Sequence, residues 1–206
     1  MTTFKIEQHR LLVATLNQEK ILAKAGSMVA YSGNIKFEKA ILGGEGLLGV
    51  VKRKVTDESF TLMVVKGAGT VYLADQAQEI TILELRDERM FIESHSLLAF
   101  DAELKTNVSF AGFRGATTGQ GLFTTTVSGR GQVAVVSTGN LLTFLITPTT
   151  PLYVDPDAFI GYQGNLKQEF ILDVNWKTLM GEASGETYQL KFTGDGIVYI
   201  QPSERR

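Results

Sequence analysis

One segment of the sequence recurs three times, and this repeat constrains the fold more than any other feature. Residues 11–36 align without a gap with residues 80–105, and residues 142–167 form a third copy in the same register. At most of the apolar positions, apolar residues fall on apolar residues. The equivalent sets include Met28, Leu97 and Phe159; Val29, Leu98 and Ile160; Tyr31, Phe100 and Tyr162; and Leu22, Phe91 and Tyr153. A repeat of this kind indicates a supersecondary unit that buries its apolar face against neighbouring copies.

Each copy is followed by a second block, which contains a Gly-x-Gly sequence between two strand-like runs. These blocks cover residues 58–74, 121–136 and 186–201. Glycine reaches positive φ without steric cost, and residues with positive φ form the tight turns of β-hairpins. We therefore expect three hairpin turns. Their glycines are Gly67 and Gly69, Gly129 and Gly131, and Gly194 and Gly196.

The runs inside each unit have the composition of β-strands. Residues 70–73 and 80–85 are rich in β-branched and aromatic side chains and are bounded by turn-forming residues. The sequence thus predicts an all-β protein in which three repeated β-subunits have a pseudo-threefold arrangement. It predicts a single domain over residues 1–206, with internal repeats at approximately 11–75, 80–137 and 142–202.

Composition excludes several kinds of chemistry. Cysteine is absent, and the only histidines are His9 and His95, so thiolate catalysis, Cys-based zinc sites and three-histidine metal centres are excluded. We expect no cofactor. The net charge of −2, from 20 basic and 22 acidic residues, supplies no field for strong non-specific binding to nucleic acid or membranes. The N-terminal residues contain no apolar segment of the signal-peptide kind, and no apolar run approaches the roughly 18 residues of a membrane span. We therefore expect no signal peptide and a cytoplasmic protein.

Two motifs with functional associations are better explained as structure. Residues 93–96 combine Glu, Ser and His, but neighbouring residues point apart, whereas the members of a catalytic triad converge. His95 aligns with Gly26 and Asp157, so we interpret it as a surface turn residue. Residues 44–49 fit the dinucleotide pattern Gly-x-Gly-x-x-Gly, but a β-like run follows instead of the required helix. We expect no catalytic residues and no metal ligands in these motifs.

Three lysines end the copies of the first block at equivalent positions: Lys36, Lys105 and Lys167. If the copies surround an axis, these lysines could converge on an anion or on RNA phosphates. The alternative is that each lysine ends a strand on its solvent face. A separate basic cluster lies at residues 52–54. It could contact an acidic partner or nucleic acid, and the alternative is a solvated strand or a strand edge that charge protects from aggregation.

The order of the Gly-rich and aromatic blocks carries a family resemblance. The blocks are MVAYSGNIKFEKAILGGEG, FIESHSLLAFDAELK, TGQGLFTTTVSGRGQVAV, VDPDAFIGY and SGETYQLKFTGDGIVYIQ. This order resembles the Altered Inheritance of Mitochondria protein 24 family, also called domain of unknown function 124. The resemblance implies a fold like that of the tryptophan RNA-binding attenuation protein, with β-sandwich units of the double-stranded β-helix kind. It also implies a link to mitochondrial inner-membrane organisation in the mitochondrial relatives, and no agreed catalytic residues.

Three functions remain open at this point. The first is a non-enzymatic scaffold or interaction protein that binds a protein partner or associates with itself. The second is a module for a small ligand, an anion or RNA, suggested by the resemblance and by the three lysines. The third is an enzyme with a cupin-like cavity and a carboxylate-only metal site. We favour the first, because no constellation of catalytic residues is visible.

Overall fold

The computed structural model describes residues 2–40, 61–111, 122–172 and 188–203, and within them the chain consists of β-strands and one short 3₁₀-helix. The elements are β1 (Thr3–Glu7), β2 (Leu11–Lys24), β3 (Met28–Lys39), β4 (Leu62–Leu73), β5 (Glu79–Glu93), η1 (Ser94–Ser96), β6 (Leu97–Asp101), β7 (Lys105–Ala111), β8 (Leu122–Ser137), β9 (Leu142–Ile146), β10 (Leu152–Val154), β11 (Phe159–Leu172) and β12 (Tyr188–Ile200). The predicted all-β fold class is confirmed. The motif at residues 44–49 and the basic cluster at residues 52–54 lie outside the described residues.

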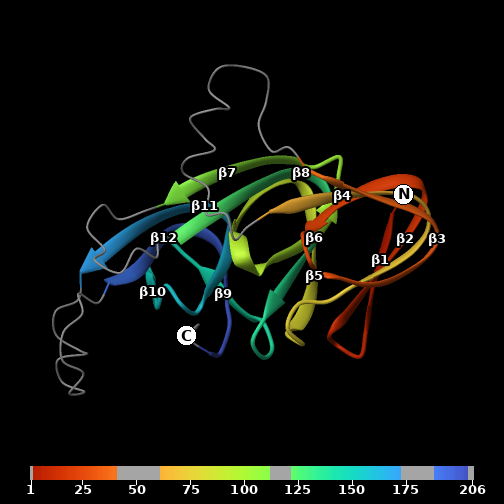
Figure 1. The fold of residues 1–206 in the computed structure, drawn as a ribbon. Coiled ribbons are helices and arrows are strands. Elements are labelled where there is room, and N and C mark those ends of the chain that lie inside the picture. Colours follow the sequence, from red (N-terminus) through yellow and green to blue (C-terminus); the bar gives the residue numbers. More distant parts are fainter. Residues whose placement is uncertain (1, 41–60, 112–121, 173–187, 204–206) are drawn as a thin grey trace.

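All twelve strands belong to one antiparallel sheet (Figure 1). Its main path runs β10-β12-β11-β5-β8-β6-β2-β4-β3, and β1, β7 and β9 pair with β2, β8 and β12 respectively. Three long strands organise the pairing. β4 lies between β2 and β3, β8 pairs with β5, β6 and β7, and β12 pairs with β9, β10 and β11. The pseudo-threefold arrangement of the units and the comparison with the tryptophan RNA-binding attenuation protein stay predictions.

The Gly-x-Gly sequences lie inside continuous strands, so the prediction of hairpin turns there is wrong. β4, β8 and β12 pass straight through all six glycines. Gly67 has φ +134° and Gly194 has φ +119°, and a Cβ at either position would overlap a carbonyl oxygen of the paired strand. The glycines of β4 and β12 therefore permit close approach between backbones, whereas Gly129 and Gly131 of β8 face the side chains of Leu104 and Asp101. None of the six reverses the chain.

Two one-residue bulges accompany these glycines. Gln18 in β2 and Asp87 in β5 have φ of 58° and 64°, and the strand register shifts by one residue at each. They lie opposite Gly67 and Gly129 respectively. Such bulges strengthen the local twist of a sheet, and a curled sheet can enclose apolar side chains on its concave face.

The apolar side chains form three core clusters, one around each long strand. The cluster around β4 includes Val65 and Val71 and also takes in Leu98 from β6. The cluster around β8 includes Val133 and takes in Ile160 from β11. A third cluster surrounds β12. The first two clusters are thus each completed by a side chain from the next segment of the chain.

Candidate interaction surface

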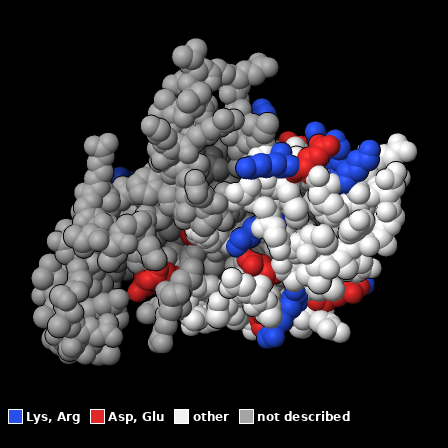
Figure 2. All heavy atoms as spheres, in the orientation of Figure 1, with Lys and Arg blue, Asp and Glu red and all other residues white. Residues whose placement is uncertain are grey.

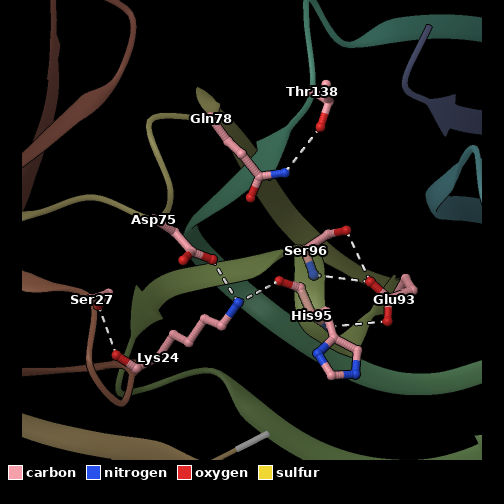
Figure 3. A network of polar contacts seen from close by, with 8 residues as sticks. All are labelled: Lys24, Ser27, Asp75, Gln78, Glu93, His95, Ser96 and Thr138. Atoms are coloured by element: carbon pink, nitrogen blue, oxygen red, sulfur yellow. Dashed lines mark hydrogen bonds and ion pairs between the residues drawn. The ribbon is translucent and has the colours of Figure 1, made fainter. Parts of the chain in front are cut away.

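A network of polar contacts joins the end of β2 to the segment around η1 (Figure 3). The Lys24 ammonium lies 2.6 Å from the Asp75 carboxylate and donates a hydrogen bond of 3.0 Å to the His95 carbonyl oxygen. The Gln78 amide donates to the Thr138 hydroxyl at 3.3 Å. Both charged side chains of the Lys24–Asp75 pair are largely buried. The opposite charges of Lys24 and Asp75 neutralise each other. The network therefore links segments that are distant along the chain.

The motif at residues 93–96 is held in hydrogen bonds of its own. The Glu93 carboxylate accepts bonds of 3.0 Å from the backbone N–H groups of His95 and Ser96 and from the Ser96 hydroxyl. The Ser94 hydroxyl lies 2.9 Å from the Thr125 hydroxyl. These contacts cap the 3₁₀-helix and fix the chain between β5 and β6, because a carboxylate at a helix start satisfies otherwise unpaired N–H groups.

A polar hollow of about 830 Å³ lies beside this network, lined in part by Lys24 and His95. Gln201 closes one side of it. The Gln201 side-chain oxygen accepts the Thr138 backbone N–H at 3.0 Å, and its nitrogen donates to the Asp157 carbonyl oxygen at 3.1 Å. The hollow is therefore crossed by bonds between segments of the same chain.

A second hollow, of about 710 Å³, has a lining of mixed charge, which we call the β2–β4 groove. Its charged residues are Glu19, Lys20, Lys36, Lys66, Asp101, Glu103 and Arg130. Lys66 pairs with Glu38 at 2.7 Å, and Arg130 pairs with Asp87 at 2.6 Å. On the described part of the face in Figure 2, basic and acidic side chains likewise lie next to one another. Neighbouring opposite charges weaken the net field that a polyanion would meet.

One carboxyl group of this groove has a shifted pKa. Burial raises the pKa of the Asp101 carboxyl above its usual value of 3.8, against the effect of the Gln132 backbone N–H, which donates to it at 2.7 Å. The nearby carboxylates of Glu103 and Glu19 raise this pKa further. Asp101 therefore holds its proton to a higher pH in the folded protein than in the unfolded chain.

The three lysines of the repeat lie on three different strands. Lys36 is on β3 and lines the β2–β4 groove, Lys105 begins β7, and Lys167 is on β11, where it pairs with Glu169 at 2.7 Å. Along the sheet, β4, β2, β6, β8 and β5 separate β3 from β11. Lys36 and Lys167 thus do not lie on neighbouring strands, and an anion site built from all three lysines stays a prediction.

The described part of the chain holds no group of three or more His, Asp or Glu residues placed to bind a metal ion. Among the same residues, no helix has the length and apolar character needed to cross a membrane.

Apolar side chains are exposed on the strands that end the sheet path, β3 and β10, and on β9, which pairs with β12 beside β10. Their exposed fractions run from 38% to 74%. They are Met28, Val29 and Tyr31 on β3; Leu142, Phe144 and Leu145 on β9; and Tyr153 on β10. Exposed apolar groups that gather on one element, unlike scattered ones, are typical of protein or membrane contact sites, ligand grooves and aggregation-prone surfaces.

These side chains lie on strands that have an open flank. Within the described residues β3 pairs only with β4, and β10 pairs only with β12. Figure 1 shows β3 on one side of the molecule and β9 and β10 on the other. We call residues 28–32 the β3 edge and residues 152–154 the β10 edge. An open edge offers unpaired N–H and C=O groups to another strand.

Neither edge was identified from the sequence. Met28, Val29 and Tyr31 match apolar residues of the other two copies in type and spacing, so their pattern predicts burial. Their exposure depends on which strand lies beside them, and a single sequence does not contain that information. The sequence signal that could identify them is that they belong to the first and the last copy of the repeat, each of which has a neighbouring copy on one side only.

Comparisons with known proteins bear on the family and on the fold. The profile of the family described as Mitochondrial biogenesis AIM24 matches residues 4–203. A crystal structure of a Streptococcus pyogenes protein is similar to this chain with a TM-score of 0.75 at 22% sequence identity, over 99% of this chain and 94% of that one. At this identity the likeness concerns the fold alone. No curated protein matches the chain significantly.

Proposed function

The chain belongs to the Mitochondrial biogenesis AIM24 family, and from this premise we propose that it is a non-enzymatic scaffold that binds other polypeptide chains through its open strand edges. The proposal rests on the β3 edge and the β10 edge, where apolar side chains and unpaired backbone lie together. Strand addition to an open edge is an established mode of polypeptide recognition: the backbone supplies affinity and the alternate side chains supply specificity.

The hydrogen bonds and the ion pair made by the polar side chains support the same proposal. Glu93 and Ser94 are buried and engaged in hydrogen bonds that hold the segment around η1. Lys24 and Asp75 are engaged with each other. The residue types that would serve as base, nucleophile or acid thus have structural partners. The edge side chains make only local contacts, Tyr31 with Phe37 and Tyr153 with Lys191, and among the described strands one backbone flank of each edge is unpaired.

Photo-crosslinking in the cells that make the protein tests this proposal. The photoreactive residue p-benzoylphenylalanine takes the place of Tyr31 in one variant and of Tyr153 in another, because both side chains are about half exposed on the edges. We expect covalent adducts with a polypeptide from both positions, since strand addition brings a partner chain within a few ångströms.

The matched control carries the same photoreactive residue in place of Arg86, whose side chain is 79% exposed on β5, away from both edges. We expect few adducts there. If Tyr31 and Tyr153 give no more polypeptide adducts than Arg86 does, the scaffold proposal is wrong.

A second candidate function is the binding of a small anion in the β2–β4 groove. Lys20, Lys36, Lys66 and Arg130 line this groove and favour it, whereas Glu19, Asp101 and Glu103 weaken it. Calorimetric titration with inorganic phosphate at two salt concentrations tests whether the groove binds a small anion. Binding that weakens with salt and is lost in Lys36→Ala would support an anion site, and absence of heat would exclude it.

A further inference from the structure

The same strand junction occurs twice within the chain. At the first junction, Leu22 of β2 lies opposite Phe100 of β6. At the second, Phe91 of β5 lies opposite Tyr162 of β11. Leu22 is equivalent to Phe91 in the sequence repeat, and Phe100 is equivalent to Tyr162. The two junctions are thus identical in register: each antiparallel, three residues long, and centred on equivalent residues.

At the second junction, the strand pairing brings two aromatic side chains into contact. The rings of Phe91 and Tyr162 stack with centroids 4.5 Å apart and an interplanar angle of 12°. Next to them, a Cβ on Gly161 would lie 2.6 Å from the Phe91 carbonyl oxygen, so the backbones approach closely here and the position favours glycine. The equivalent residues, Ala99 at the first junction and Ala30 on β3, carry a Cβ, so this close approach is a feature of the second junction.

Each junction also inserts an apolar side chain into the core of the preceding segment. Leu98 enters the cluster around β4, and Ile160 enters the cluster around β8. Their exposed fractions are 0% and 1%. Val29, the equivalent residue on β3, has an exposed fraction of 63%. The apolar side chain is present in the first segment, but it has no core to enter.

Tyr31 shows the same contrast. Its exposed fraction is 51%, whereas its equivalents Phe100 and Tyr162 are exposed by 0% and 8%. At the other end of the chain, Tyr153 is equivalent to Leu22 and Phe91, and it too is 51% exposed. The β3 edge and the β10 edge are therefore the two unmatched halves of the junction that the chain forms twice.

We propose that two copies of this chain associate head to tail, with the β3 edge of one copy pairing antiparallel with the β10 edge of the other in the register of the internal junctions. Tyr31 of one copy then lies opposite Tyr153 of the next, Ala30 opposite Val154, and Val29 enters the core cluster around β12. This inference rests on the proposed function and names the partner as a second copy of the chain.

The occupant is a second copy because its β10 edge matches the β3 edge in the register of the two internal junctions. The β3 edge carries the residue types that fill the partner side of both internal junctions, and the β10 edge carries those of the opposite side. Figure 1 places the two edges on opposite sides of the molecule, so they do not meet within one chain. A heterologous contact of this kind produces a ring if the rotation closes and a filament if it does not.

Single-edge variants test the proposal by light scattering coupled to size-exclusion chromatography. The variant Val29→Glu blocks the β3 edge, and Tyr153→Glu blocks the β10 edge. Both side chains are exposed in the single chain, so we expect both variants to fold, as checked by circular dichroism. We expect the wild type to form assemblies that grow with concentration, and each variant to have a dissociation constant raised by at least about tenfold, as for a central interface residue.

Mixing the two variants tests the head-to-tail direction. In the equimolar mixture, the intact β10 edge of the Val29→Glu chain can pair with the intact β3 edge of the Tyr153→Glu chain. We expect a particle with twice the mass of the single chain and nothing larger.

The control Leu145→Glu changes the most exposed apolar residue of β9, outside the paired residues, and we expect it to assemble like the wild type.

Several outcomes would overturn the proposal. A wild type that is monomeric at every concentration contradicts it, as do variants that assemble like the wild type or a mixture without dimers. If Leu145→Glu lowers association as much as Val29→Glu does, the contact is a non-specific apolar one. Mass spectrometry of the photo-crosslinked adducts separates this inference from the proposed function: adducts with a different polypeptide refute only the second copy, whereas absence of any polypeptide adduct refutes both.

Discussion

Asp101 makes the stability of the protein depend on pH in a direction that can be stated from its surroundings. Burial raises the pKa of its carboxyl above 3.8, so the folded protein holds this proton at pH values where the unfolded chain has released it. Between 3.8 and the raised pKa, the folded state binds more protons than the unfolded state, and the free energy of unfolding increases as the pH falls.

The variant Asp101→Asn keeps an oxygen that accepts the Gln132 N–H but cannot ionise. We expect the wild type to gain stability relative to this variant as the pH falls from about 7 to about 4, since only the wild type loses the cost of the buried charge. Urea unfolding at a series of pH values measures the difference. A difference that stays constant, or that changes in the other direction, would contradict this account.

Glu93 stabilises the fold through the three hydrogen bonds that its carboxylate accepts at η1. We expect Glu93→Gln to lower the free energy of unfolding by about 1–3 kcal/mol, because bonds to a charged acceptor are strong and the site is buried. The control is Asp155→Asn, whose carboxylate accepts the exposed Asp157 N–H. We expect a smaller loss there, and equal losses in the two variants would argue against a special role for Glu93.

At the scale of single elements, the glycines of the long strands determine how closely neighbouring strands approach. A Cβ at Gly194 would overlap the carbonyl oxygen of Asn165 on β11, and this part of β12 has φ +119°. Overlap with backbone cannot be relieved by a rotamer change, so the strands must separate locally.

We expect Gly194→Ala to destabilise the protein by about 3 kcal/mol, as the sum of backbone strain and overpacking. Gly26→Ala is the matched control, since Gly26 has φ +85° but no atom within 4 Å of the added Cβ. There we expect only the conformational cost of about 1 kcal/mol. Thermal unfolding of both variants measures the two effects, and equal losses would show that close packing at Gly194 contributes nothing.

The Lys24–Asp75 pair links elements that are far apart in the sequence. Its charged groups are largely buried, whereas the Arg86–Glu84 pair on β5 is mostly exposed. In double-mutant cycles we expect a coupling energy of about 1–3 kcal/mol for Lys24–Asp75 and less than about 0.5 kcal/mol for Arg86–Glu84, because solvent screens exposed pairs. Equal coupling energies would mean that burial does not strengthen the first pair.

At the scale of the whole molecule, the proposed head-to-tail association predicts that stability depends on protein concentration. If a second copy covers Val29 and Tyr31, association stabilises the folded state by mass action. We expect the Tm of the wild type to rise with concentration and the Tm of Val29→Glu to remain constant. Differential scanning calorimetry over a hundredfold concentration range measures this, and a constant Tm for the wild type would contradict self-association.

The sequence by itself determined the fold class and the equivalence of positions. Alternation of β-branched and aromatic residues between turn-forming residues predicted strands at residues 70–73 and 80–85, and both lie within β4 and β5. Such patterns can be read locally, because side chains of a strand alternate between its two faces. The family resemblance noted from the ordered blocks is confirmed by the match over residues 4–203.

Only the tertiary structure decided the role of the glycines. From the sequence, Gly67 and Gly69 looked like turn residues, since positive φ is common to turns and to strands that approach closely. Gly67 instead lies mid-strand, against the carbonyl oxygen of Asn34. Whether such a glycine forms a turn or lies within a strand depends on a neighbouring strand more than thirty residues away along the chain. Local composition does not contain that information.

The tertiary structure also decided which members of the repeat are exposed. Val29, Leu98 and Ile160 are equivalent in the sequence, yet the latter two are buried and Val29 is not. The physical reason is that burial of a strand residue depends on the strand beside it. The chain supplies that strand beside β6 and beside β11, but among the described residues no strand lies on the open flank of β3.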